Sequence, residues 1–289
     1  MMMFNGYNAG LVESITRWLE EDIGAGDITT AVTVPQGHES KGIIHAKEAG
    51  IVAGIEIAQR VFEVVDRTLT FTPLVKDGDS VAKGTVLAVV EGSTHSVLTG
   101  ERLALNLLQR MSGIATKTRT FIDVLNGLPV RLVDTRKTTP GHRMLEKYAV
   151  RVGGGSNHRF GLYDAVMIKD NHIKGSGSIA EAVSRARANI PHTMKIEVET
   201  ENLMQVDEAL TAGADIIMLD NMEPGLMKQA VSHIKEKAPH VIVEASGNVS
   251  LQTIRSIAES GVDVISVGRL TYSFESLDIS LDLNEKKVG

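Results

Sequence analysis

The stretch GADIIMLD, residues 213–220, places a glycine and an aspartate before an unbroken apolar run that ends in a carboxylate. Two other stretches resemble it, GLYDAVMIKD at 161–170 and GVDVISVGR at 261–269. An apolar run without polar alternation indicates a strand buried on both faces, as in parallel sheets covered by helices. Repetition of the same unit predicts a β/α fold.

Six such runs follow one another from residue 130 onward. They are VRLVD (130–134), AVMIK (165–169), MKIEVE (194–199), DIIMLD (215–220), VIVEAS (241–246) and DVISVG (263–268). Helix-like stretches separate them, among them 178–190, 202–210 and 251–260. Nearly every run ends on a charged or small polar residue. A doubly wound sheet needs such residues only near its switch point, whereas a barrel gathers all its strand ends around one mouth, so we predict a barrel.

The first part of the chain has a different pattern. Its expected elements are a helix near 11–20, a strand at 42–50, a helix at 55–66, a hairpin-like segment at 75–92 and a long helix over about 96–125. The segment 277–284 is expected to return to this part as a strand. We therefore predict an N-terminal α+β domain over 1–115, joined by 270–289, and a β/α barrel domain over 116–269.

Composition favours an ordinary cytoplasmic protein. Cysteine is absent, so disulfides and thiolate metal sites are excluded, which suits a reducing compartment. The N-terminus lacks the basic and apolar regions of a signal peptide, and no apolar run reaches the roughly 18 residues of a membrane span. We expect no membrane association.

Charge is unevenly distributed. The chain carries a net charge of −6, yet residues 134–174 hold eight Lys or Arg against four Asp or Glu. A compact basic region suits a small anionic ligand better than nucleic acid, which requires an extended basic face. Aromatic residues make up 4% of the chain, which also disfavours stacking on single strands.

Two loops supply most of the basic side chains. DTRKTTPGHR (134–143) follows the first barrel strand, so Thr135, Arg136 and Lys137 should lie at the rim of the mouth. GGGSNHRFG (153–161) offers His158 and Arg159, donors suited to binding a carboxylate, after three glycines that suggest a mobile loop or close ligand approach. Each pair would more often be a solvated surface pair if it stood alone.

Charged residues also end the next strands. Lys169 would be costly to bury alone, so we expect an ion pair with Glu199 or Glu197, or else a role in anion binding or as a Schiff base. Glu199 and Asp220 close consecutive strands, and they could neutralise the basic cluster or hold Mg²⁺. The nine histidines show no zinc-like spacing.

Small residues follow the last two strands, in Ser246-Gly247-Asn248 and in Gly268-Arg269. At helix starts such residues expose backbone N–H groups and form the phosphate site common in barrels. One mouth would thus bind a phosphorylated sugar together with a polyacid.

At this level of detail the sequence resembles the quinolinate phosphoribosyltransferase family. The matching motifs are GERLALNLLQRMSGIAT (100–116), DTRKTTPGHRMLEKYAV (134–150), GGGSNHRFGLYDAVMIKDNH (153–172), EVE, IIMLDN, EASGN and ISVGRLTYS. The resemblance implies an open, incomplete β/α barrel with a small sandwich-like N-terminal domain. It also implies the joining of quinolinate to 5-phosphoribosyl 1-diphosphate with loss of CO₂, which gives nicotinate mononucleotide and diphosphate in NAD biosynthesis.

The same resemblance implies residue roles. Arg102 would be donated to the site of a partner subunit in a homodimer, with a hexamer left open. The expected quinolinate site is Arg136, His158, Arg159 and Lys169, with Lys137 and Arg143 nearby. Glu199 and Asp220 would face the ribose and Mg²⁺, and the residues expected at the phosphates are Ser246, Gly247, Asn248, Gly268 and Arg269. The side chains expected to act on the reacting groups are Lys137, Lys169, Glu199 and Asp220.

One residue departs from the family pattern: Tyr272 stands where histidine is expected. Three alternatives stay open. A related phosphoribosyltransferase-like protein of molybdenum transport loci would act on a different base. A class I aldolase would use Lys169 as its Schiff base. A lipoyl-type carrier would use segment 75–92, which lacks a suitable tip lysine.

Overall fold

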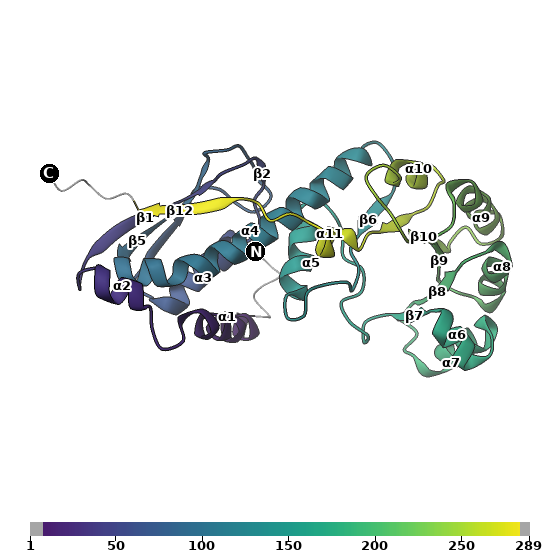
Figure 1. Cartoon of the computed structure of the whole chain (residues 1–289). Coiled ribbons are helices and arrows are strands. Elements are labelled where there is room, and N and C mark those ends of the chain that lie inside the picture. The colour runs from purple at the N-terminus through teal and green to yellow at the C-terminus, as the bar shows by residue number, and fades with distance from the viewer. Residues whose placement is uncertain (1–7, 284–289) are drawn as a thin grey trace. The chain divides into compact units, whose positions relative to one another are not determined.

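A computed structural model describes residues 8–283 (Figure 1). The chain forms two compact units. One contains residues up to Thr116 together with the segment from Glu275 onward, and the other is Lys117–Phe274. The boundary falls within the long helix α4 (Thr94–Val124), which the sequence predicts at 96–125.

The first unit is built on an antiparallel sheet with strand order β12-β1-β5-β3. Its strands are β1 (Glu39–Ala46), β3 (Thr70–Pro73), β5 (Val86–Ser93) and β12 (Ile279–Leu283). Its helices, besides the first part of α4, are α1 (Asn8–Ile23), α2 (Ile28–Thr33) and α3 (Ile55–Val65). The returning strand is confirmed, because β12 pairs with β1 from Gly42↔Leu283 to Ala46↔Ile279.

The prediction of a hairpin at 75–92 is wrong. β4 (Ser80–Val81) pairs with β2 (Gly50–Ile51) in a separate two-stranded sheet, whereas β5 pairs with β1 and β3. Tight turns do occur at Gly78 and Gly84, both with positive φ, but the two-residue strand between them pairs with β2 and not with β5.

The second unit contains a six-stranded parallel sheet in the order β6-β11-β10-β9-β8-β7. Its strands are β6 (Arg131–Val133), β7 (Val166–Ile168), β8 (Ile196–Thr200), β9 (Ile216–Asp220), β10 (Ile242–Ser246) and β11 (Val264–Ser266). All six predicted runs are therefore strands. β6 and β7 form the two edges and do not pair with each other, so the barrel is open and incomplete, as the resemblance implies.

Helices follow the strands of this unit, and α7, α8 and α9 lie along the outer side of the sheet (Figure 1). The unit's helices, besides the end of α4, are α5 (Arg143–Val152), α6 (Asp170–Ser176), α7 (Ile179–Asn189), α8 (Leu203–Ala212), α9 (Pro224–Lys237), α10 (Ile254–Ala258) and α11 (Arg269–Tyr272). Local signals set their ends: Ser178 and Asn202 cap α7 and α8 through their side chains, and α8 ends at the left-handed Gly213. Within residues 8–283, no helix combines the length and apolarity needed to cross a bilayer.

Candidate active site

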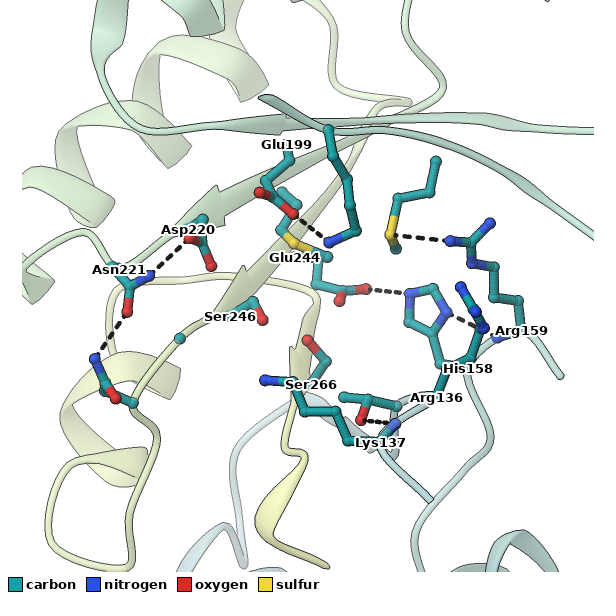
Figure 2. Close-up of a pocket in the computed structure, with 16 residues that line it drawn as sticks. Arg136, Lys137, His158, Arg159, Glu199, Asp220, Asn221, Glu244, Ser246 and Ser266 are labelled. Atoms are coloured by element: carbon teal, nitrogen blue, oxygen red, sulfur yellow. Dashed lines mark hydrogen bonds and ion pairs between the residues drawn. The ribbon is translucent and has the colours of Figure 1, made fainter. Parts of the chain in front are cut away.

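The carboxyl ends of the parallel strands surround a pocket of about 580 Å³ (Figure 2). Strand alternation selects the side chains that line it, because residues two apart share one face. Met167 and Lys169 come from β7 and the residue after it, Met218 and Asp220 from β9, and Glu244 and Ser246 from β10. The intervening residues Ile168, Leu219 and Ala245 are buried and belong to the other face.

The basic loop after β6 rests on a buried ion pair. Lys147 donates to Asp134 at 2.5 Å and to the carbonyl oxygen of His158 at 3.0 Å, and the Lys147 and Asp134 side chains are both 0% exposed. Asp134 also accepts from Asn157 Nδ2 at 2.6 Å and from the His158 backbone N–H at 2.9 Å. Asp134 is therefore not a rim residue: it joins the loops that present Arg136 and His158.

Arg136 and Lys137 line the pocket beside Thr135, as expected. The Thr135 hydroxyl accepts from the Lys137 backbone N–H at 3.0 Å, and the Arg136 Nε is buried without a hydrogen-bond partner among the described residues. The Lys137 ammonium lies 5.9 Å from the centroid of the Tyr272 ring. Tyr272 thus supplies a ring face to this lysine where a histidine was expected.

Arg159 and Arg143 have different surroundings. Arg159 lines the pocket and donates to the Ala165 carbonyl oxygen at 3.0 Å. Burial and the charge of Arg136 lower the pKa of Arg159, although a guanidinium stays charged at neutral pH. Arg143 instead donates to the Phe160 carbonyl oxygen at 2.9 Å and to Thr138 at 3.0 Å, so it ties two loops together and does not line the pocket.

His158 lies against two buried carboxylates. Its Nε2 is 3.3 Å from Glu197 Oε2 and 3.4 Å from Glu244 Oε2, and its Nδ1 lies 2.7 Å from the Arg159 backbone nitrogen. Burial opposes the charged form, but the hydrogen bonds to Glu197 and Glu244 outweigh it and raise the pKa of His158 to about 10. Burial also raises the pKa of Glu197.

The expected ion pair of Lys169 is present. Lys169 Nζ donates to Glu199 Oε2 at 2.6 Å, with the lysine side chain 42% exposed and the glutamate 14% exposed. Glu197, the alternative partner, is occupied by His158. Lys169 is therefore an ion-paired, accessible cation at the rim.

Asp220 is held at the rim by Asn221, which is held in turn by Asn248. Asn221 donates to Asp220 Oδ2 at 2.7 Å, and Asn248 donates to Asn221 Oδ1 at 3.0 Å. Both asparagines have positive φ, 52° and 49°. Gly247 has φ +92°, and a Cβ atom there would lie 2.2 Å from Asn221 Oδ1, so only glycine fits.

Of the two helix starts expected at the phosphate loops, one is present and one is not. Gly268 directly precedes α11, which begins at Arg269. After Gly247, however, α10 begins only at Ile254, so the loop amides there belong to turns and not to a helix start. The three glycines 153–155, expected to allow loop motion or close ligand approach, are instead explained by local structure. Gly153 ends α5, Gly154 is left-handed, and a Cβ on Gly155 would lie 2.8 Å from Val150.

The structure gathers most of the predicted site residues around this pocket. Those that line it are Thr135, Arg136, Lys137, His158, Arg159, Lys169, Glu199, Asp220, Ser246, Gly247 and Asn248. Gly268, Arg269 and Arg143 do not line it. Arg102 belongs to the other unit, on α4, with its side chain 58% exposed.

Five further lining residues were missed: Met167, Met218, Asn221, Glu244 and Ser266. Glu244 had a signal in the sequence. A glutamate inside the apolar run VIVEAS, like Glu197 inside MKIEVE, is costly to bury unless it has a partner. The methionines gave no signal, because an apolar residue in a buried strand is ordinary.

One group of three potential metal ligands occurs among residues 8–283, namely His158, Glu197 and Glu244, whose nearest ligand atoms lie within 4.8 Å of one another. The imidazole already faces both carboxylates, so the group is an ion-paired cluster. The oxygen-rich rim at Asp220 and Glu199 suits a hard cation such as Mg²⁺ better.

Comparison with known proteins gives consistent results. The model of the quinolinate phosphoribosyl transferase C-terminal domain matches residues 114–282, and that of the N-terminal domain matches 27–112. A probable nicotinate-nucleotide pyrophosphorylase (carboxylating) of Synechocystis is 47% identical over 93% of this chain and 91% of its own length. A protein of the same name from Bacillus subtilis is 46% identical over 94% and 93%. The crystal structure of NadC from Streptococcus pyogenes is 42% identical, with a TM-score of 0.90 over 96% of this chain and 98% of that one.

Proposed function

The chain belongs to the quinolinate phosphoribosyltransferase family, and we propose that the pocket at the strand ends is its active site. The enzyme is a pentosyltransferase that joins quinolinate to the phosphoribosyl group of 5-phosphoribosyl 1-diphosphate and releases diphosphate and CO₂. Its product is nicotinate mononucleotide, a precursor in NAD biosynthesis. The comparisons do not favour the alternative of a molybdenum-locus relative acting on another base.

The observation that carries the proposal is the convergence of four cationic or donor side chains on one wall of the pocket. Arg136, His158, Arg159 and Lys169 come from two loops and a strand end, and all four line the same pocket. Figure 2 shows the first three close together on one side of it. Quinolinate has two adjacent carboxylates on a pyridine ring, so it requires several fixed donors. Guanidinium groups bind carboxylates in planar, bidentate geometry, which orients the ring nitrogen.

The opposite wall suits the sugar phosphate. The backbone amides around Ser246, Gly247 and Asn248, in a loop that requires glycine, can approach a phosphate closely. Lys137 lines the same pocket and provides a cation for the diphosphate. Displacement of diphosphate builds positive charge on the ribose, which Glu199 and Asp220 stabilise.

Mg²⁺ is proposed at Asp220. Glu199 is committed to Lys169 at 2.6 Å, whereas one Asp220 oxygen accepts from Asn221 and the other is available to a cation. Oxygen donors and phosphates are the ligands that Mg²⁺ prefers, with water completing the shell. When bound, the ion would neutralise charge on the diphosphate.

Decarboxylation needs little from the protein. Once the ring nitrogen is bonded to the ribose it is positively charged, and it accepts the electrons left when the neighbouring carboxylate departs as CO₂. The main work of the site is therefore to position the two substrates and to stabilise charge. The ring nitrogen attacks without losing a proton, so this step requires no general base.

The assembly is proposed to be a homodimer in which Arg102 of one subunit completes the site of its partner. The side chain of Arg102 is exposed, and within the chain it has a weak pairing with Glu101 at 3.9 Å. Location in the cytoplasm is proposed because the chain lacks cysteine, as suits a reducing compartment.

The test is direct. Purified protein is incubated with quinolinate, 5-phosphoribosyl 1-diphosphate and Mg²⁺, and nicotinate mononucleotide and CO₂ are measured, with nicotinate as a parallel substrate. We expect product from quinolinate and none from nicotinate, which lacks the second carboxylate. Binding of quinolinate without turnover would contradict the proposed binding of 5-phosphoribosyl 1-diphosphate in this pocket. Absence of quinolinate binding would contradict quinolinate as the substrate.

A further inference from the structure

Three side chains of helix α5 hold the two loops that carry the proposed carboxylate-binding residues. Glu146 and Lys147 follow Arg143 by three and four positions, so the three side chains lie on one face of the helix. Glu146 and Lys147 are fully buried, whereas Arg143 is partly exposed. The pocket is not lined by any of the three, so they act on it through the loops that they contact.

Arg143 joins the two loops directly. Its Nε donates to Thr138 Oγ1 at 3.0 Å, and its Nη1 donates to the carbonyl oxygen of Phe160 at 2.9 Å. Thr138 lies two residues after Arg136, and Phe160 directly follows Arg159. The donors of a guanidinium are held in a rigid planar fork. The two hydrogen bonds therefore fix the distance between the loops beside the arginine that each loop presents to the pocket.

Glu146 and Lys147 anchor the same two loops at other points. Glu146 Oε2 accepts from the Thr139 backbone N–H at 3.2 Å, and Lys147 Nζ donates to the carbonyl oxygen of His158 at 3.0 Å. Replacing either residue would disturb a fully buried charge. The acceptors of Arg143 are a hydroxyl and a carbonyl oxygen, so replacing Arg143 leaves no charge without its counter-ion. Arg143 is therefore the residue at which the connection between the loops can be tested.

The spacing of the loops matters for a ligand with two carboxylates, and this step rests on the proposed function. Arg136 and Arg159 line the pocket from different loops, and Figure 2 shows them close together. Quinolinate carries its carboxylates on adjacent ring carbons, at one fixed separation. A ligand that binds both arginines at once requires the loops at a matching separation. A ligand with one carboxylate needs one arginine and tolerates a change in that separation.

We propose that Arg143 is a positioning residue that sets the separation of Arg136 and Arg159, and that it thereby selects a ligand with two adjacent carboxylates. Arg143 itself does not contact the substrate. Without its two hydrogen bonds the loops lose their direct connection, and a dicarboxylate has to order both arginines as it binds. That ordering opposes binding, whereas a preorganised pair of side chains avoids it.

The test compares two probes that require no turnover. Phthalate is a benzene ring with two adjacent carboxylates, and benzoate has one. In ligand-observed NMR titrations, Arg143→Met should raise the Kd for phthalate about tenfold, the scale expected when two long side chains must be ordered on binding. The Kd for benzoate should stay nearly unchanged. In steady-state kinetics the KM for quinolinate should rise with that for phthalate binding, and the KM for 5-phosphoribosyl 1-diphosphate should not.

Two further variants serve as controls. Arg187→Met is matched, because Arg187 also connects two segments, through the Gly213 carbonyl oxygen at 2.8 Å and Asp215 at 2.9 Å, away from the pocket. It should bind both probes as the wild type does. Arg143→Lys keeps the positive charge but lacks the planar fork, so it should show the same selective loss of phthalate binding. Wild-type binding by Arg143→Lys would mean that charge alone attracts the ligand, which would overturn the proposal.

Other results would also overturn it. They are wild-type phthalate binding by folded Arg143→Met, equal weakening of both probes, or a raised KM for 5-phosphoribosyl 1-diphosphate, which would place Arg143 at a phosphate. If thermal melting shows that Arg143→Met does not fold, Thr138→Val removes one of its two acceptors and should weaken phthalate binding about threefold, with no change refuting the role. A wild-type protein that binds phthalate no better than benzoate would instead refute the proposed function.

Discussion

Gly247 shows what a single position contributes to the site. Its left-handed backbone turns the chain away from β10, and the absent Cβ leaves room for the side-chain Oδ1 of Asn221. This oxygen accepts from Asn248 Nδ2 and thereby joins the loops after β9 and β10. The sequence predicted a small residue at a phosphate loop here. The contact with Asn221 could not be predicted, because it depends on how two loops distant in sequence meet.

Gly247→Ala should therefore weaken binding of 5-phosphoribosyl 1-diphosphate. Strain of about 1–3 kcal/mol would raise the KM for this substrate about 5- to 150-fold, with a smaller effect on quinolinate. Steady-state kinetics with each substrate varied in turn would measure this. Gly213→Ala is the control, because it has φ +78° but no atom within 4 Å of the added Cβ and ends a helix on the outer side. Equal KM changes for both substrates would contradict the assignment of this loop.

His158 should make stability depend on pH. The folded pKa of about 10 lies above the ordinary value of 6.5, so the stabilisation is complete below pH 6.5 and is lost as the pH rises towards 10. Within this window each proton held only by the folded state changes the free energy of unfolding by about 1.4 kcal/mol per pH unit. Urea unfolding between pH 6.5 and 9.5 should show this slope, and His158→Gln should flatten it. A variant at the exposed His240 serves as the control, and an unchanged slope in His158→Gln would refute the account.

At the scale of elements, the strands were predictable and their partners were less so. The six apolar runs of the second unit became strands because each run is buried on both faces, a property that the composition of the run alone expresses. The segment 75–92 failed as a hairpin because turn glycines specify a reversal of the chain but not the strand with which the chain pairs. Asp134 was counted among the polar strand ends expected at the mouth, yet it forms a buried ion pair with Lys147, whose burial on α5 the sequence did not reveal.

The Asp134–Lys147 pair should be essential to stability. Lys147→Met leaves a fully buried carboxylate without its counter-ion, at a cost of about 3–5 kcal/mol in the free energy of unfolding. The Lys235–Asp263 pair offers a comparison, because its side chains are 32% and 41% exposed, and Lys235→Met should cost about 1 kcal/mol or less. Denaturant unfolding measures both. Similar losses for the two variants would show that burial does not decide the contribution of these ion pairs.

At the scale of the whole molecule, the pocket lies entirely within the second unit, since its lining runs from Thr135 to Ser266. The cationic side chains that line the pocket were predictable from charge and strand ends, because local sequence places them at one edge of the sheet. The role proposed for Arg102 in the first unit was not predictable from local sequence, and it rests on the family resemblance. An exposed arginine on a long helix has no local feature that distinguishes it from a solvated surface residue.

Mixing two inactive variants tests this contribution. Arg102→Ala and Arg136→Ala chains should each lose most activity. In a hybrid dimer, the Arg102→Ala chain keeps its own Arg136 and receives Arg102 from its partner, so one of its two sites is intact. Random exchange of subunits makes half of the dimers hybrids, and the mixture should therefore regain about one quarter of wild-type activity. Native mass spectrometry of differently tagged chains would confirm exchange, and no recovery after confirmed exchange would mean that Arg102 does not act across a subunit interface.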